Sequence, residues 1–242
     1  MTEIIAMWSG PRNLSTAMMR SFGARADCSV MDEPFFAPYL AVTGKEHPGR
    51  DETLQHHETN PDKVAAMCAS PADQTRYSFQ KHMPHHMLDS FSLSWTEKAK
   101  HFFLLREPER VIASYVKGRS EFEIEDLGFA PQRRLFERLT KTLGHCPPVI
   151  HSHDILKAPE RALRALCNAL NMPFDSAMLS WPAGPRAEDG AWAPYWYASV
   201  QNSTGFGAAP TDMPVLTESH KVIAMQCRDD YEALAQHAVV II

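Results

Sequence analysis

Residues 3–22 read EIIAMWSGPRNLSTAMMRSF, and this stretch decides how the N-terminal part of the chain is expected to fold. The short apolar run from Ile4 to Trp8 predicts a buried strand, and the residues from Ser15 onward predict a helix. Between them lies the turn SGPRNLST, which combines a glycine, an arginine and two hydroxyl residues. A plain connection between a strand and a helix does not need this combination, so the turn is a candidate functional site.

The turn SGPRNLST has the chemistry of an anion-binding loop. Backbone N–H groups at a helix N-terminus lack partners within the helix and favour negative charge. An arginine adds a planar fork of donors that suits phosphate or sulfate. An ordinary turn with a hydroxyl cap and a surface arginine explains the stretch equally well, and the GxxxxGK[ST] signature is absent. The candidate ligands of an anion are Gly10, Arg12, Asn13, Ser15 and Thr16.

Composition limits the class of protein. The chain has 242 residues, of which 44% are hydrophobic and 22% charged, as in soluble globular proteins. The formal net charge of -5 argues against a broad nucleic-acid-binding surface, so any anion site is expected to be local. No apolar run approaches the roughly 18 residues that span a membrane. The five cysteines form no CxxC pair, and the N-terminus lacks a basic leader, so we expect a cytoplasmic protein.

Strands and helices are expected to alternate along the chain. Alternation favours an α/β fold, in which a mostly parallel sheet of about five strands has helices on both faces. We expect residues 1–242 to form a single domain, with an apolar tail at 239–242 that is buried or lies at a homodimer contact. The expected strands are Ile4–Trp8, Ser29–Met31, Tyr77–Gln80, His101–Leu105 and Val149–His151, and the expected helices are Ser15–Ala26, Pro61–Ser70, His85–Ser94, Pro108–Lys117, Pro131–Leu143, Pro159–Leu170 and Glu218–His237.

A second basic motif follows the fourth expected strand. Arg106 ends the apolar run, and Ser114 comes eight residues later in a helix that begins at Pro108. Eight residues are a little over two helical turns, so Ser114 lies on a defined face of that helix. In sheets of this kind, ligands bind beyond the carboxyl ends of the strands. Arg106 and Ser114 are therefore candidates for a shared anion, although an arginine paired with Glu107 or Glu109 is the simpler interpretation of this motif alone.

Together the two motifs resemble the sulfotransferase family, whose members use 3′-phosphoadenosine 5′-phosphosulfate (PAPS), and most closely its divergent bacterial and plant members. The resemblance implies that Arg12, Ser15 and Thr16 hold the 5′-phosphosulfate. It also implies that Arg106 and Ser114 hold the 3′-phosphate. The loop departs from the family pattern, because Asn13-Leu14 stands where the family has Ser-Gly and leucine tolerates a positive φ poorly.

Transfer of a sulfuryl group requires a base that takes the proton of the acceptor. Glu33 follows the second strand in VMDEPFF, beside an apolar wall that would raise its pKa. If the chain is extended there, only one of Asp32 and Glu33 can point into the site. His82 follows the third strand in QKHMPHH, with Lys81 beside it. A glutamate and a histidine in similar positions serve as base in different branches of the family, so both remain candidates.

The late segment GPRAEDGAWAPYWYASVQNSTGF, residues 184–206, is rich in aromatic residues and in helix breakers. It resembles a loop that folds over the nucleotide in the family. By that resemblance Arg186 contacts the 3′-phosphate side and Trp192 packs on the adenine. The alternative is that most of these rings cover the core from outside.

The expected function is transfer of a sulfuryl group from PAPS to a hydroxyl or amine of a small-molecule acceptor. No membrane or nucleic-acid partner is expected. No metal is expected either: His82 and His86 have the helical spacing of zinc ligands, but the glutamate of HExxH is missing and no cysteine pair helps. The alternatives are a kinase-like phosphotransferase, for which the loop lacks a lysine, and a nucleotide-binding module without catalysis. No lysine has the context expected for pyridoxal phosphate in an aminotransferase.

Overall fold

The apolar runs of the sequence pair into one sheet in the computed structural model, which describes residues 2–72, 74–118 and 122–241. All the paired strands are parallel, and their order is β2-β3-β1-β4-β5. This confirms the expected sheet, and each strand matches an expected one to within two residues at either end. The strands are β1 (Glu3–Ser9), β2 (Cys28–Asp32), β3 (Tyr77–His82), β4 (Ala99–Leu105) and β5 (Val149–His151).

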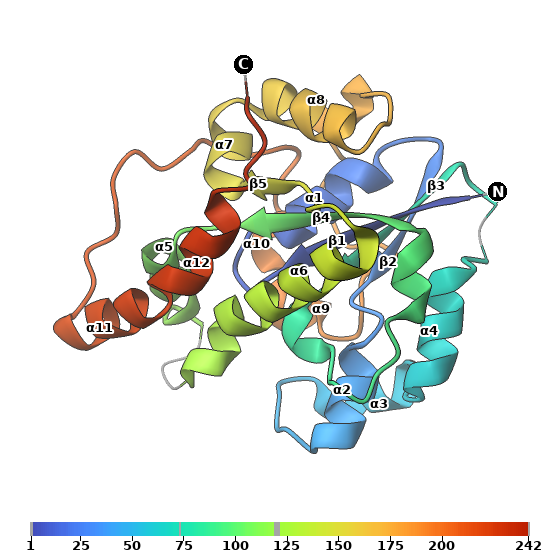
Figure 1. The fold of residues 1–242 in the computed structure, drawn as a ribbon, viewed down its shortest axis with the longest axis horizontal. Helices are drawn as coiled ribbons and strands as arrows, with labels where there is room; N and C mark the ends of the chain where they lie inside the picture. Colours follow the sequence, from blue (N-terminus) through green and yellow to red (C-terminus); the bar gives the residue numbers. More distant parts are fainter. Residues whose placement is uncertain (1, 73, 119–121, 242) are drawn as a thin grey trace.

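Helices cover both faces of the sheet, which forms the middle layer. On one face α1 and α8 pack on the apolar side chains of the strands, and on the other face α4, α6 and α12 do so (Figure 1). A third apolar cluster joins α5 to α11. The helices are α1 (Ser15–Gly23), α2 (Phe36–Thr43), α3 (Arg50–His56), α4 (Pro61–Ala69), α5 (Pro108–Tyr115), α6 (Phe129–Leu143), α7 (Ser152–Lys157), α8 (Pro159–Ala169), α9 (Ala193–Trp196), α10 (Ala198–Gln201), α11 (Glu218–Gln226) and α12 (Arg228–Ala235).

The alternation of side chains along each strand decides which residues can reach which layer. Met7 of β1 packs in the cluster of α1, whereas its neighbour Trp8 packs in the cluster of α6. In the register of β1 with β3, Met7 lies opposite Lys81 and Trp8 lies opposite His82. Because successive side chains point to opposite faces, Lys81 lies on the α1 face and His82 on the α6 face.

Two expected helices differ in the structure. Residues 85–94 do not form one helix: Pro84–His86 and Ser94–Lys98 are short 3-10 helices. Serine side chains compete for the backbone between them, since Ser94 N donates to Ser92 Oγ at 3.2 Å. The expected helix 218–237 is divided at Cys227 into α11 and α12.

One further region differs from the sequence-based expectation. Helices α2 and α3 lie within residues 36–56, where no helix was expected. The described part of the tail packs against the sheet at one residue, where Val239 N donates to Val149 O at 2.8 Å, and Val240 is exposed, so the alternative of a homodimer contact stays a prediction. Ile242 lies outside the described residues.

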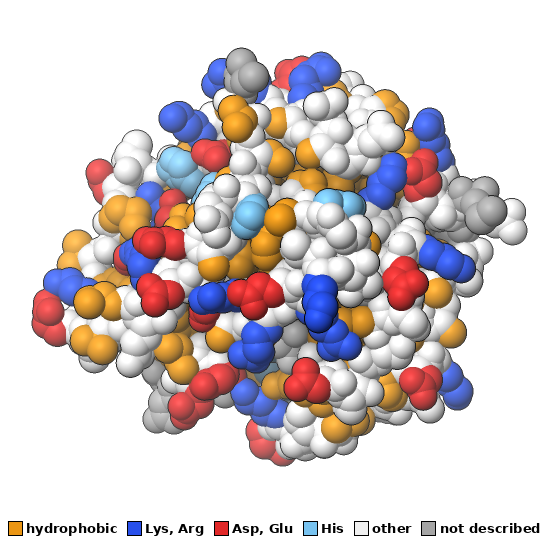
Figure 2. All heavy atoms as spheres, in the orientation of Figure 1, with side chains coloured by type: hydrophobic (Ala, Val, Ile, Leu, Met, Phe, Trp, Pro, Cys, Tyr) orange, Lys and Arg blue, Asp and Glu red, His pale blue; other side chains and the backbone are white. Residues whose placement is uncertain are grey.

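The surface on the side of α6 and α12 carries charges of both signs. Figure 2 shows Lys and Arg side chains interspersed with Asp and Glu over this face, with apolar side chains between them. This face therefore presents no extended field of one sign. None of the described helices is long and apolar enough to cross a membrane.

A buried histidine links β1 to β4 on the α6 face. Trp8 Nε1 donates to His101 Nδ1 at 3.0 Å, and His101 Nε2 lies 2.8 Å from Thr96 O. The indole N–H can only donate and the carbonyl can only accept, so the imidazole is neutral, with its proton on Nε2. Burial lowers the pKa of His101 to about 4.

This arrangement predicts a loss of stability in acid. The folded-state pKa of His101 lies below the ordinary value of 6.5, so the unfolded chain binds more protons between these pH values. The free energy of unfolding should fall as the pH falls through this window, by about 3 kcal/mol at pH 4 from His101 alone. His101→Asn should be less stable at pH 7 and show a flatter decline in denaturant titrations between pH 7 and pH 4. The matched control is His56→Gln at an exposed histidine, which should keep the wild-type slope, and an equally steep decline in His101→Asn would contradict the assignment.

Candidate functional site

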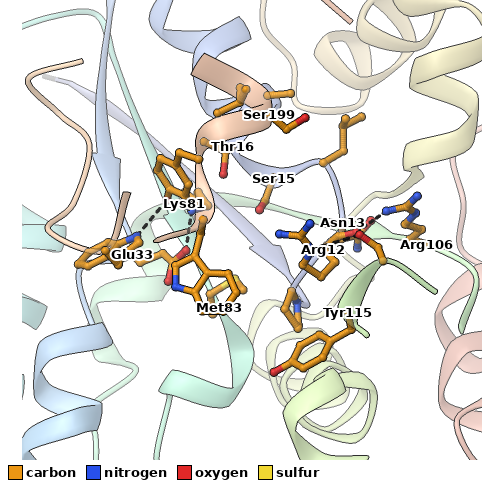
Figure 3. Close-up of a pocket in the computed structure, with 18 of the residues that line it drawn as sticks. Arg12, Asn13, Ser15, Thr16, Glu33, Lys81, Met83, Arg106, Tyr115 and Ser199 are labelled. Atoms are coloured by element: carbon orange, nitrogen blue, oxygen red, sulfur yellow. Dashed lines mark hydrogen bonds and ion pairs between the residues drawn. The ribbon is translucent and has the colours of Figure 1, made fainter. Parts of the chain in front are cut away.

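A cavity of about 490 Å³ lies beyond the carboxyl ends of the strands, where parallel α/β sheets bind ligands. Each strand from β1 to β4 delivers a side chain to it at or just after its end. Figure 3 shows Arg12, Asn13 and Arg106 at one end of the cavity and Glu33 and Lys81 at the other. Residues 192–207 supply a further wall, which includes Trp192, Trp196, Tyr197, Ser199, Val200, Ser203, Gly205, Phe206 and Gly207.

The basic end brings together the two motifs of the sequence. Arg12 Nε donates to Ser114 Oγ at 3.1 Å, and Arg106 Nη1 donates to the backbone oxygen of Arg12 at 2.5 Å. The turn after β1 and the helix after β4 therefore meet at the cavity. Both guanidinium groups are partly buried, and the resulting loss of hydration lowers the pKa of each. An anion between them would restore favourable contacts to both.

The loop after β1 is held in a strained form. Arg12 and Leu14 have φ angles of 57° and 63°, in the left-handed region that side chains with a Cβ rarely adopt. Asn13 is buried, and its Nδ2 donates to Leu104 O at 2.6 Å, which ties the loop to β4. Leu14, which stands where the family has glycine, therefore adopts the left-handed backbone itself.

The other candidates of the loop differ in position. Ser15 and Thr16, in the first turn of α1, line the cavity between its two ends (Figure 3). Gly10 does not line it, and a Cβ there would come within 3.1 Å of Leu127 O. Gly10 therefore permits close packing of the loop on its neighbour.

The other end of the cavity is organised around a buried lysine. Lys81 is 1% exposed, and its Nζ donates to Asp32 Oδ1 at 2.8 Å, Glu33 Oε1 at 2.5 Å and Tyr197 Oη at 2.5 Å. Burial acts to lower the pKa of Lys81, but the charges of Asp32 and Glu33 outweigh it and raise the pKa well above its ordinary value. The ammonium group is therefore charged, and its three N–H groups each have an acceptor.

The two carboxylates beside Lys81 have different surroundings. Asp32 also accepts from Gly190 N at 3.1 Å and from the Tyr197 hydroxyl at 2.7 Å, and it does not line the cavity. Glu33 lines the cavity, and its Oε2 lies 3.8 Å from His86 Nδ1. Burial raises the pKa of Glu33, with Lys81 opposing and Asp32 adding to the rise. A carboxylate with a raised pKa that faces a cavity has the properties of a general base.

Both acids reach Lys81 because the backbone is not extended at Glu33. Its φ angle is 41°, so the alternation expected for an extended chain does not apply there. Only one of the two acids, Glu33, lines the cavity, as expected for an extended chain. Both acids nevertheless contact Lys81, which an extended chain would not allow.

His82 does not reach the cavity. It is 1% exposed, its ring stacks on Trp8 with centroids 4.6 Å apart, and its Nε2 lies 3.2 Å from Gln80 Oε1. Strand β3 continues through His82, so the alternation that brings Lys81 into the cavity turns His82 to the opposite face. Burial also lowers the pKa of His82 well below its ordinary value. This position does not agree with the expectation that His82 faces the acceptor.

One expectation for the late segment needs correction. Arg186 does not line the cavity, and its Nη2 donates to Pro182 O at 2.7 Å. Trp192 lines the cavity, and its Nε1 donates to Tyr197 Oη at 3.0 Å, so its contact with the adenine stays a prediction. At 2% exposure, Trp192 belongs to the core cluster that packs on α1, as the alternative interpretation expected.

Sequence reasoning missed Tyr197, considered His86 only as a zinc ligand and gave Lys81 only a secondary place. Lys81 could have been found from the alternation of side chains along β3, because a strand that continues to His82 places Lys81 on the α1 face. Nothing in the sequence near Tyr197 indicates that its hydroxyl meets residues from β2 and β3. Within the described ranges, no group of three or more His, Cys, Asp or Glu side chains is placed to hold a metal ion.

A helix N-terminus beyond the strand ends of a parallel sheet is a place where proteins bind phosphate or sulfate groups. The family comparison identifies the class of protein: the family model described as a sulfotransferase domain matches residues 2–236, and the chain belongs to this family.

Two plant proteins match nearly the whole chain in sequence. Two Arabidopsis thaliana proteins, named branched-chain-amino-acid aminotransferase-like proteins 1 and 2, are 36% and 35% identical to this chain over 235 and 238 residues. Each alignment covers 97% of this chain but 42% of the relative, so the chain spans less than half the length of these proteins.

Solved structures share the fold at low sequence identity. A sulfotransferase from Alicyclobacillus acidocaldarius superposes with a TM-score of 0.58 at 11% identity and covers 99% of this chain and 98% of its own. A sulfotransferase domain from the curacin biosynthetic pathway gives a TM-score of 0.51 at 16% identity, with 94% and 98% covered.

The basic end of the cavity predicts stabilisation by a simple oxyanion. At concentrations too low for its general stabilising effect on proteins, inorganic sulfate should raise the melting temperature relative to chloride at equal ionic strength, because it would bind the folded protein and not the unfolded chain. Arg12→Ala should lose most of this rise, and Arg12→Lys should recover part of it, since lysine keeps the charge but not the planar fork. Arg138→Ala, at an exposed residue of α6, is the control. Equal rises in all four proteins would remove Arg12 from anion binding.

Proposed function

We propose that this chain transfers a sulfuryl group from PAPS to a hydroxyl or amine of a small-molecule acceptor. The observation that carries the proposal is a single cavity with Arg12, Arg106 and Ser114 at one end and Glu33 at the other. The first set is suited to the anionic groups of the donor, and the second supplies a base for the acceptor. The family of the chain supports transfer of a sulfuryl group, and the donor and acceptor are part of the proposal.

The residues at the basic end fit the two anionic groups of PAPS. The N-terminus of α1, with Ser15, Thr16 and the Arg12 guanidinium, would hold the 5′-phosphosulfate. Arg106 and Ser114 would hold the 3′-phosphate. PAPS supplies the sulfuryl group, and transfer of this group to the acceptor leaves negative charge on the 5′-phosphate. Arg12 cannot release its proton at neutral pH, so its part is to stabilise that charge.

Glu33 is the base in this proposal. It would take the proton from the acceptor as the oxygen or nitrogen attacks sulfur, and the proton would reside on the carboxylate afterwards. Asp32, Glu33 and Lys81 together carry one net negative charge when both acids are ionised. Proton uptake by Glu33 makes this buried group neutral, which a site of low polarity favours. His82 retains no direct path to the acceptor from the opposite face of β3.

Calorimetric titration with 3′-phosphoadenosine 5′-phosphate (PAP) and with ATP tests the donor before any acceptor is known. Preference for PAP supports the proposal, whereas activity that depends on ATP and magnesium would replace it with a phosphotransferase. Tight binding of PAP with no consumption of PAPS would indicate a binding module. The two plant relatives are much longer than this chain, so their aminotransferase-like name is not transferred to it.

The first prediction of the proposal concerns the 3′-phosphate. Arg106→Ala should weaken PAP binding by about 2 kcal/mol, because a charge-assisted contact to phosphate is lost. Adenosine 5′-phosphosulfate lacks the 3′-phosphate, and its binding should change far less. Calorimetry with both ligands measures the difference, and Arg138→Ala serves as the control for a general loss of positive charge. Equal losses for the two ligands would remove Arg106 from this role.

The second prediction concerns the base. With water as the acceptor, Glu33→Gln should lower the rate at which PAPS is converted to PAP and sulfate by roughly 10²-fold, while PAP affinity stays near wild type. In the wild type this rate should rise with pH through the raised pKa of Glu33, since the carboxylate must be ionised to act. His82→Gln should keep most of the turnover and lose stability, because its ring is packed in the core. The opposite pattern in the two variants would return the role of base to His82.

A further inference from the structure

The hydroxyl group of Tyr197 lies at the centre of the acidic end of the cavity. It accepts from Lys81 Nζ at 2.5 Å and from Trp192 Nε1 at 3.0 Å, and it lies 2.7 Å from Asp32 Oδ2, to which it donates. One donor and two acceptor sites are all that a phenol offers, so the group is fully used. Burial raises the pKa of Tyr197 well above its ordinary value, which keeps the hydroxyl protonated.

Tyr197 also marks the point where the chain turns from the core to the wall of the cavity. Gln201 N donates to Tyr197 O at 2.9 Å in α10, and most of the residues in the segment 199–207 line the cavity. Residues 180–184 hold the far side of this segment, with Trp181 N donating to Thr204 O at 3.1 Å and Gly184 N donating to Gln201 O at 2.7 Å. Along the near side, the Tyr197 hydroxyl links the segment directly to Lys81.

We propose that Tyr197 is a positioning residue for sulfuryl transfer, whose hydroxyl fixes the Lys81 ammonium and through it the orientation of the Glu33 carboxylate. This inference rests on the proposed function for its consequence in catalysis, and on the contacts alone for its effect on Glu33. The same hydroxyl joins the wall formed by residues 199–207 to the base. The Tyr197 hydroxyl therefore fixes the position of the wall relative to the base, Glu33.

The groups that face Glu33 define what loss of the hydroxyl does. They are Asp32 from β2, Lys81 from β3, His86 from the 3-10 helix Pro84–His86 and Tyr197 from the junction of α9 and α10. Without the hydroxyl, the ammonium of Lys81 has two acceptors in place of three. Its charge is then shared between the two carboxylates alone, so it stabilises the ionised form of Glu33 more strongly and the proton affinity of Glu33 falls.

The experiment compares wild type with Tyr197→Phe, which keeps the ring and removes only the oxygen. Tyr195→Phe is the matched control, because Tyr195 lies in the same segment, is 50% exposed and does not line the cavity. Glu33 is followed by carboxyl-carbon NMR with labelled glutamate, and Glu33→Gln assigns its signal. The same proteins are titrated with PAP by calorimetry and assayed for conversion of PAPS to PAP.

The expected result for Tyr197→Phe is a Glu33 titration midpoint about one pH unit below wild type. Conversion of PAPS should be about tenfold slower, with PAP affinity within about threefold of wild type. Tyr195→Phe should match wild type in all three measurements. Identical Glu33 titrations in wild type and Tyr197→Phe would overturn the proposal.

Two other outcomes are informative. If the Glu33 midpoint shifts but wild type neither binds PAP nor consumes PAPS, the proposed function fails while the link between Tyr197 and Glu33 stands. If Tyr197→Phe does not fold, labelled tyrosine in the wild type provides the test. The chemical shift of the Tyr197 ring carbon should then change with pH at the titration midpoint of Glu33, and this change should be absent in Glu33→Gln. A chemical shift that does not change at that midpoint in the wild type would overturn the proposal.

Discussion

An ammonium group buried at the carboxyl end of β3 constrains the whole acidic end of the cavity. A charge in this position is stable only if anions and hydrogen-bond acceptors surround it. Asp32 and Glu33 supply the anions from the end of the neighbouring strand, and Tyr197 supplies an acceptor from more than a hundred residues further along the chain. One residue of β3 thus contacts both the end of β2 and the late segment, and it does so beside the carboxylate that faces the cavity.

The two ends of the cavity have opposite electrostatic character. At one end Arg12 and Arg106 approach each other through the backbone oxygen of Arg12, and both have lost hydration. At the other end two carboxylates share one ammonium, and burial raises the pKa of Glu33. In the proposed reaction, a donor with anionic groups would bind at the first end and a proton would be taken up at the second. The difference in charge along one cavity would then let an anionic donor meet a neutral acceptor.

Much of this arrangement could be predicted from local sequence patterns. Apolar runs indicated the strands, and the rule that ligands bind beyond strand ends indicated that Arg12, Arg106 and Ser114 would meet. The position of His82 could not be predicted, because ending β3 two residues early, at Gln80, hides the alternation that separates it from Lys81. The shared contacts of Asp32 and Glu33 depend on a left-handed backbone at Glu33, and the contact of Tyr197 depends on tertiary packing, neither of which a local pattern encodes.

Backbone strain is concentrated at the same cavity. Among the described residues, the non-glycine positions with positive φ are Arg12, Leu14, Glu33 and Asn171, and the first three line the cavity. Such conformations persist only where the surrounding structure enforces them. Asn13 fixes the loop to β4, and Lys81 holds Glu33 through its carboxylate. A glycine would relieve the strain at any of the three positions but would remove the guanidinium, the apolar contact or the carboxylate, so the strain follows from placing these side chains where the chain turns away from the sheet.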